Sequence, residues 1–177
     1  MTLVDAEGNR TLKVADFGLS RKIAVPARRM TKEVSTLWYR APEVLLDNLC
    51  YSQAMDMWSV GTIIFEMLYG EIMFKGDSEI DQIIKIFSYK GTPTRKTLKS
   101  YDKCPVLLKI GNVLPKFSSK NPKDSDSIFT TEESNINDDL LLLIESLTNL
   151  EPTKRPSARQ AFEKLSKMEL RSVSDQV

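Results

Sequence analysis

Apolar residues in this chain recur mainly at helical spacing. The longest such stretch covers residues 53–69, where apolar side chains occur on nearly every face of the expected helix, Trp58, Ile63 and Phe65 among them. A helix that is apolar on most faces is typical of the centre of a core. We therefore predict a mainly α-helical fold that is built around residues 53–69, with Trp58 in its core.

Start and stop signals predict four shorter helices. Ser78 opens an amphipathic helix with Ile80, Ile83, Ile84 and Phe87 on one side, and the run from Gly91 to Pro93 ends it. Pro in the first turn favours a short helix at 42–46, and residues 138–150 form an apolar helix. Ser157 and Gln160 make a capping box for a last helix that ends near Leu170.

The N-terminal residues predict a β-hairpin. Two short apolar runs, 3–5 and 11–15, are separated by the turn-forming pair Gly8-Asn9, and the second run leads directly to Asp16. We expect this strand to hold the Asp16 carboxylate in place. Residues 96–137 are rich in Ser, Lys, Asn, Asp and Pro, which predicts a long, partly ordered connection.

Composition narrows the class of protein. The 177 residues carry a net charge of +1, so we expect no bulk attraction to nucleic acid or membrane. Histidine is absent, which excludes histidine-based catalysis and histidine metal ligands within these residues. Cys50 and Cys104 are far apart in the sequence, and two cysteines do not make a disulfide framework. The N-terminal residues do not show the pattern of a signal peptide. We expect an intracellular protein of the nucleus or cytoplasm.

Two tripeptides bracket a polar, basic loop. Asp16-Phe17-Gly18 opens it and Ala41-Pro42-Glu43 closes it, a pairing typical of the activation segment of protein kinases. The loop also carries Thr31 among several arginines, and a phosphate on Thr31 could pair with their guanidinium groups. A solvated basic loop between coincidental motifs is the plainer alternative.

The run from Thr31 to Glu43 resembles a cyclin-dependent kinase, as do residues 56–61 and 76–82, Gly91-Thr92-Pro93 and Arg155. The resemblance is close over residues 3–91 and looser over 138–161. It implies the C-terminal lobe of a Ser/Thr kinase, with a partial kinase domain at 1–170 and a tail at 171–177. The parent activity would be transfer of the ATP γ-phosphate to Ser or Thr, with preference for a following proline.

The resemblance also implies roles for individual residues. Asp16 would ligate Mg²⁺, Thr31 would be the activating phosphosite, and Arg21 would clamp its phosphate. Thr36 would steady the catalytic groups of the complete enzyme, although no catalytic residue itself falls in this chain. The pocket for the proline would be shaped by Val34, Ser35 and Arg40, although Ser35 stands where the family carries an apolar residue. The structural roles fall to Glu43 paired with Arg155, and to Asp56, which would hold the backbone of the catalytic loop.

Several parts of a kinase are missing from these 177 residues: the Gly-rich loop, the strand Lys, its helix Glu and the His-Arg-Asp motif. Phosphoryl transfer depends on such positioning groups, so we expect this chain alone to be inactive and to bind neither ATP nor Mg²⁺ tightly. By resemblance the partners are a cyclin, protein substrates and small kinase-subunit proteins. Two alternatives stay open: a non-catalytic binding module and a pseudokinase remnant.

The same absence predicts poor stability. The elements that cover the 53–69 helix in whole kinases precede this stretch of the family's sequence, so Trp58, Ile63, Phe65 or their neighbours would face water. Each large apolar side chain left exposed forfeits about 1.5–3 kcal/mol. Because a domain is stable by only about 5–15 kcal/mol, we expect the isolated chain to be unstable or to aggregate.

Overall fold

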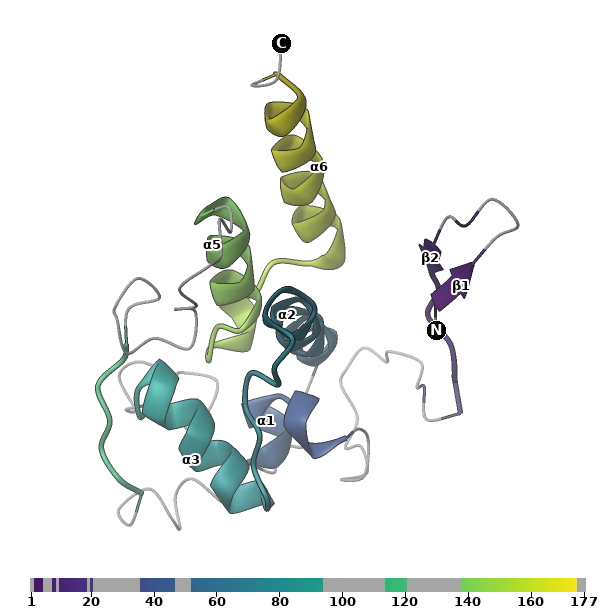
Figure 1. The fold of residues 1–177 in the computed structure, drawn as a ribbon. Helices are drawn as coiled ribbons and strands as arrows, with labels where there is room; N and C mark the ends of the chain where they lie inside the picture. The colour runs from purple at the N-terminus through teal and green to yellow at the C-terminus, as the bar shows by residue number, and fades with distance from the viewer. Residues whose placement is uncertain are drawn as a thin grey trace.

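A computed structural model of the chain describes residues 2–4, 8, 10–18, 20, 36–46, 52–93, 114–120 and 138–174. The predicted mainly helical fold with a short N-terminal hairpin is confirmed (Figure 1). In chain order the elements are β1 (Thr2–Val4), β2 (Arg10–Leu12), the 3-10 helix η1 (Leu37–Tyr39), α1 (Pro42–Leu45), α2 (Ala54–Tyr69), α3 (Glu79–Lys90), α5 (Asp138–Leu147), the 3-10 helix η3 (Pro152–Lys154) and α6 (Ala158–Ser174).

Helix α2 is the central element, as its apolar composition predicts. On one side its Trp58 and Phe65 join a core with α1, α3 and the segment between α2 and α3, where the Trp58 and Phe74 rings stack at 5.9 Å. On another side Met57 packs with α5 and α6. The α2–α5 contact is close because Gly61 has no side chain: a Cβ there would stand 2.8 Å from Thr148 Cγ2.

One face of α2 is not covered. Val60, Ile63 and Met67 are 39%, 44% and 70% exposed, and their spacing places them in a single row that we call the α2 stripe. Of the residues expected to face water, Ile63 does so together with its neighbours Val60 and Met67, whereas Trp58 and Phe65 are buried. The two sides of α2 differ because the side that carries Trp58 and Phe65 packs against α1, α3 and the segment between α2 and α3, whereas no described element covers the α2 stripe.

Helix α3 begins and ends where its signals predict. The Ser78 hydroxyl accepts a hydrogen bond from the Asp81 amide at 3.2 Å, and Gly91 ends the helix with a φ of 84°. Ile83 and Phe87 are buried as predicted, but Ile80 is 61% exposed and therefore lies outside the expected apolar face. Ile80 is in the first turn of α3, next to Glu79, whose carboxylate pairs with Arg40 at the surface.

The remaining boundaries differ by a few residues. The hairpin is antiparallel with Leu3 opposite Thr11, but β2 ends at Leu12 and Asp16 lies four residues beyond it. Helix α5 ends at Leu147, earlier than predicted, and α6 continues to Ser174. The capping box forms: Ser157 N donates to Gln160 Oε1 at 2.9 Å, and Gln160 N donates to Ser157 Oγ at 3.3 Å.

Of the polar connection at 96–137, only residues 114–120 are described. This segment lies beside the end of α3, where Thr92 N donates to the Phe117 carbonyl and Lys120 N to the Tyr89 carbonyl. Within the described parts of the chain, no helix combines the length and the apolar character that crossing a bilayer requires.

Candidate functional site

The segment 36–46 is the best-anchored part of the predicted site. It contains η1 and α1 and is joined to α2, α3 and the connection between α5 and α6 by side-chain hydrogen bonds. Tyr39 Oη donates to Glu66 Oε2 at 2.7 Å, and Ser59 Oγ donates to the Tyr39 carbonyl at 2.8 Å. Because Tyr39 donates to a carboxylate, the pKa of its phenol is raised. Both bonds fasten η1 to α2.

A second set of bonds fastens η1 to α3. Trp38 Nε1 donates to the Gly76 carbonyl at 2.8 Å, while the buried Gln82 amide donates to the carbonyls of Trp38 and Phe74 at 3.1 and 3.0 Å. Gln82 Oε1 accepts from Gly76 N at 2.7 Å. All of the hydrogen-bonding groups of the Gln82 amide are thus engaged with backbone, so this side chain ties three segments together. We call it the Gln82 clamp.

Sequence reasoning missed the Gln82 clamp. The run from Gly76 to Gln82 is part of the resemblance to cyclin-dependent kinases, but its sequence gives no sign that Gln82 reaches the carbonyl of Trp38, which is 44 residues away. The available signal was a Gln at a buried helix position, since a buried amide must find hydrogen-bond partners.

Glu43 and Arg155 lie together in the core. The two guanidinium NH groups of Arg155 donate to the two Glu43 carboxylate oxygens at 2.6 and 2.7 Å, and both side chains are almost fully buried. Arg155 also donates to the carbonyls of Ala54 and Asn149. This bidentate pair joins α1 to the connection between α5 and α6.

Arg40 lies at the surface edge of the same segment. Its guanidinium forms an ion pair with Glu79 at the first position of α3, at 2.8 Å, and its side chain is 13% exposed. Thr36, the predicted supporting residue, precedes η1 and is exposed, and its carbonyl accepts from Tyr39 N. The structure thus places Thr36 and Arg40 at the two ends of η1.

Asp56 occupies the first turn of α2, one turn before the α2 stripe. No hydrogen bond or ion pair joins its carboxylate to any described residue; the residue as a whole is exposed, and partial desolvation of the carboxylate raises its pKa. A carboxylate that is partly desolvated without a partner destabilises its own fold. It is therefore a candidate for contact with a donor from another part of the protein.

Asp16, the predicted Mg²⁺ ligand, is exposed and has a positive φ of 63°. Its Oδ1 accepts a hydrogen bond from Gly18 N at 3.3 Å, and Ser20 Oγ donates to the Phe17 carbonyl at 2.6 Å. The second hairpin strand does not hold it, contrary to expectation. Phe17 is 66% exposed. The other predicted residues, Arg21, Thr31, Val34 and Ser35, lie outside the described residues.

A Mg²⁺ ion prefers hard oxygen ligands and often takes one or two carboxylates together with phosphate oxygens. The Asp16 carboxylate fits that chemistry. In the described ranges no cluster of three or more His, Cys, Asp or Glu side chains is present, so Asp16 would share the ion with ATP oxygens and with groups from outside these ranges.

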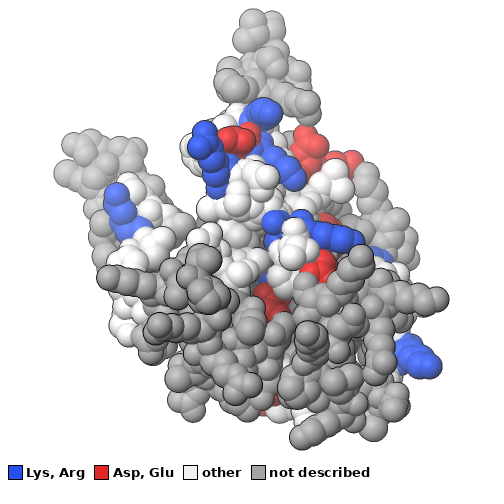
Figure 2. Space-filling model, turned by 180° about the vertical axis from the view of Figure 1, so that it is seen from behind, with Lys and Arg blue, Asp and Glu red and all other residues white. Residues whose placement is uncertain are grey.

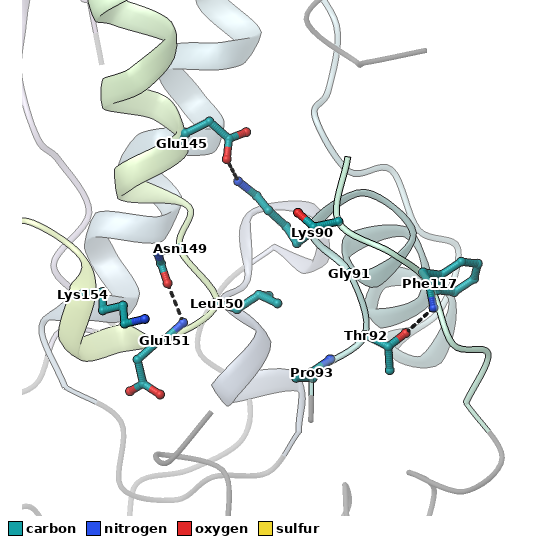
Figure 3. Close-up of a pocket in the computed structure, with 11 residues that line it drawn as sticks. Lys90, Gly91, Thr92, Pro93, Phe117, Glu145, Asn149, Leu150, Glu151 and Lys154 are labelled. Atoms are coloured by element: carbon teal, nitrogen blue, oxygen red, sulfur yellow. Dashed lines mark hydrogen bonds and ion pairs between the residues drawn. The ribbon is translucent and has the colours of Figure 1, made fainter. Parts of the chain in front are cut away.

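A separate cavity of about 360 Å³ lies where the end of α3, the segment around Phe117 and the end of α5 meet (Figure 3). At its edge the buried Lys90 donates to Glu145 Oε2 and to Thr148 Oγ1, both at 2.7 Å. Burial lowers the pKa of Lys90, while the charge of Glu145 opposes that effect. None of the predicted site residues lines this cavity, so it is distinct from the predicted kinase chemistry.

Comparison with known proteins identifies the family to which this chain belongs. Residues 2–165 match the model of the protein kinase domain. Among solved structures, the chain resembles a chain in the crystal structure of the yeast RNA Pol II CTD kinase CTDK-1 complex, with 32% identity and a TM-score of 0.74. That match covers 90% of this chain and 50% of the other, so the present chain spans half of its length.

The matches confirm the resemblance to a kinase of the cyclin-dependent type and the kinase-lobe fold inferred from the sequence. The family transfers phosphate from ATP with the help of Mg²⁺, which is the chemistry that the resemblance implies for Asp16. The chain belongs to the protein kinase family.

Proposed function

We propose that this chain is the C-terminal lobe of a cyclin-dependent-type Ser/Thr kinase and that it acts as part of a complete kinase domain. That enzyme transfers the γ-phosphate of ATP to Ser or Thr, with preference for a following proline. The observation that carries the proposal is the anchoring of segment 36–46 by the Gln82 clamp and by the Glu43–Arg155 pair. A substrate platform needs such rigidity, because phosphoryl transfer depends on positioning.

The uncovered side of α2 supports the proposal that other parts of a kinase domain complete this chain. The α2 stripe is apolar and exposed, and Asp56, which has no hydrogen-bond or ion-pair partner among the described residues, lies one turn away in the same row. A segment that buried Val60, Ile63 and Met67 while donating backbone hydrogen bonds to Asp56 would satisfy both. In the complete kinase, Asp56 holds the catalytic-loop backbone and Thr36 steadies the catalytic groups.

The remaining roles follow the family. Asp16 ligates Mg²⁺ on ATP, and phosphorylated Thr31 is clamped by Arg21. Arg40, with Val34 and Ser35, shapes the pocket for the substrate proline, and the Arg40–Glu79 ion pair fixes the direction of that guanidinium. A cyclin and protein substrates are the partners, in the nucleus or cytoplasm. By itself the chain is inactive, and it binds ATP and Mg²⁺ only weakly.

A second candidate function is a non-catalytic binding module. The exposed Ile80, next to Glu79 and Asp81 at the start of α3, favours it. An apolar side chain among charges suits the docking of a small kinase-subunit protein, and that docking needs no ATP.

The deciding experiment is 5′ extension of the transcript, followed by expression of the longest product. We expect upstream codons for the Gly-rich loop, the strand Lys and His-Arg-Asp, and phosphorylation of a Ser-Pro peptide by the product. Asp16→Asn should abolish that activity, whereas the control Asp77→Asn, at an exposed acid ahead of α3, should not. An in-frame stop codon just upstream of Met1 would contradict the enzyme and leave the binding module or a non-functional remnant.

A further inference from the structure

A second cavity, of about 490 Å³, lies between the last turn of α5, η3 and α6. Its α6 wall is formed by Gln160, Glu163, Lys164 and Lys167, whose spacing places them on one face of the helix. Lys154 of η3 also lines this cavity. Figure 2 shows lysine and arginine side chains gathered over α6 on this side of the molecule. We call this cavity the α6 pocket.

The charge in the α6 pocket is unbalanced. Lys154, Lys164 and Lys167 form no ion pair with any residue in the described ranges, and the guanidinium of Arg155 is committed to Glu43. The one acid on the α6 wall, Glu163, is paired with Arg159 at 3.1 Å. Lys85 on α3, by contrast, is paired with Asp81 at 3.1 Å. Placing like charges together costs stability, and a bound anion would remove that cost.

The hydrogen-bond donors that remain are cationic or amide groups. The hydroxyl of Ser146 donates to the Leu143 carbonyl at 2.7 Å, and that of Thr153 donates to Glu151 Oε1 at 3.1 Å. Gln160 Oε1 accepts from Ser157, which leaves its NH₂ group available. A ligand must therefore be rich in acceptors and negatively charged. Lysine ammonium groups bind phosphate as point charges, and phosphate monoesters combine both properties.

We propose that the α6 pocket binds a phosphate monoester carried on a protein side chain, phosphoserine or phosphothreonine. The α6 pocket falls within the volume range of binding sites for ligands larger than a bare ion. Its described α6 wall is polar and charged, which suits a phosphorylated peptide better than a membrane, where binding also needs apolar insertion. The inference that the ligand carries a phosphate group depends only on the lysines of the α6 pocket. The choice of a phosphorylated protein side chain as the source of that phosphate rests on the proposed kinase function.

The test measures peptide binding to the full 177-residue chain, tethered at low density so that chains cannot associate. The probes are a phosphoserine peptide, the same peptide with serine, inorganic phosphate, and vesicles of phosphatidylcholine with phosphatidylserine. The variants are Lys154→Gln and Lys164→Gln, with Lys116→Gln as the matched control, because Lys116 is exposed and does not line the α6 pocket. Far-UV circular dichroism checks that each variant folds like the parent, as surface changes should.

We expect the phosphopeptide to bind at least about tenfold more tightly than the serine peptide, and each pocket variant to weaken it about tenfold, the effect of losing a charged hydrogen bond. Lys116→Gln should change binding less than about twofold, and added salt should weaken it. Equal loss in Lys116→Gln, equal binding of the serine peptide, equal affinity for inorganic phosphate, or no binding at low salt would each overturn the proposal. Lysine-dependent binding of vesicles without binding of the phosphopeptide would replace it with a membrane site. No outcome depends on ATP, so failure here is separate from failure of the kinase proposal.

Discussion

Arg155 is the residue at which distant segments of the chain meet. Besides its two bonds to Glu43 it donates to the carbonyls of Ala54 and Asn149, and its guanidinium lies over the Trp58 ring at 5.1 Å. All of its hydrogen-bonding groups are thus committed inside the fold. Removing the cation would leave the Glu43 carboxylate charged and buried, which is the costly case for an ion pair in a core.

We therefore predict that Arg155→Met destabilises the protein by about 3–5 kcal/mol. The measurement is urea unfolding followed by tryptophan fluorescence. The control is Arg159→Met, because the Arg159–Glu163 pair is largely exposed and contributes about 0.5 kcal/mol or less. Similar losses for both variants would contradict the view that burial makes the Glu43–Arg155 pair important.

Asp56 provides a prediction with a pH dependence. Burial raises its pKa above the ordinary 3.8, so the folded protein binds its proton more readily than the unfolded chain does. The cost of the charge is absent below the ordinary pKa, appears as pH rises through the raised pKa, and is complete at neutral pH. Asp56→Asn should therefore stabilise the isolated chain at pH 7, and the gain should vanish near pH 3.

Urea midpoints between about pH 3 and 7 test this prediction, with Asp77→Asn as the control. The same Asp56→Asn change should reduce activity in the complete kinase, where a charged Asp56 holds the catalytic loop. Stability gained together with activity lost is the pattern of a residue kept for function. A loss of stability at neutral pH in the isolated chain would show that Asp56 already has a favourable partner.

At the scale of elements, the sequence predicts the helices better than their contacts. Local signals placed the Ser78 cap, the Gly91 stop and the Ser157 capping box, since each depends on residues within one turn. The exposure of Ile80 and the early end of β2 were missed, because they depend on contacts between elements and not on residues within one turn. Within the candidate site, the pairing of Glu43 with Arg155 was predicted from the family resemblance. The Gln82 clamp was not predicted and is seen only in the structure.

The Gln82 clamp leads to a prediction about Gly76. A Cβ at Gly76 would stand 2.5 Å from both the Cα and the N of Gln82, which are backbone atoms that cannot turn aside. Gly76→Ala should therefore push α3 away from η1 and cost about 2–3 kcal/mol. Ser78→Ala, which only removes the helix cap, should cost about 1 kcal/mol.

Thermal unfolding ranks the two variants, and tryptophan fluorescence separates their causes. Gly76→Ala alone should change the emission of the folded protein, because it disturbs the hydrogen bond from Trp38 Nε1 to the Gly76 carbonyl. Equal destabilisation by both variants, with unchanged emission, would mean that the Gln82 clamp adds nothing beyond helix formation.

At the scale of the whole molecule, the α2 stripe decides how the isolated chain behaves. Val60, Ile63 and Met67 are exposed in one row, whereas Trp58 and Phe65, on the other side of the helix, are buried. The chain thus has a formed core together with an apolar row on its central helix. Exposed apolar rows of this kind promote association. We therefore expect the purified chain to self-associate through α2 while keeping its helical content.

The variant that tests this expectation is Val60→Gln/Ile63→Gln/Met67→Gln, examined by analytical ultracentrifugation and circular dichroism. Because these side chains already face water, the changes should leave helicity nearly unaltered, and they should shift the sedimentation profile from aggregates toward monomer. The control is Ile80→Gln/Leu142→Gln, which removes exposed apolar groups from α3 and α5 without touching α2. If the control restores the monomer equally well, the α2 stripe has no special role. If the unmodified chain is already a monomer with a sharp two-state melt, it folds without any covering segment, and the case that other parts of a kinase domain complete it loses its physical support.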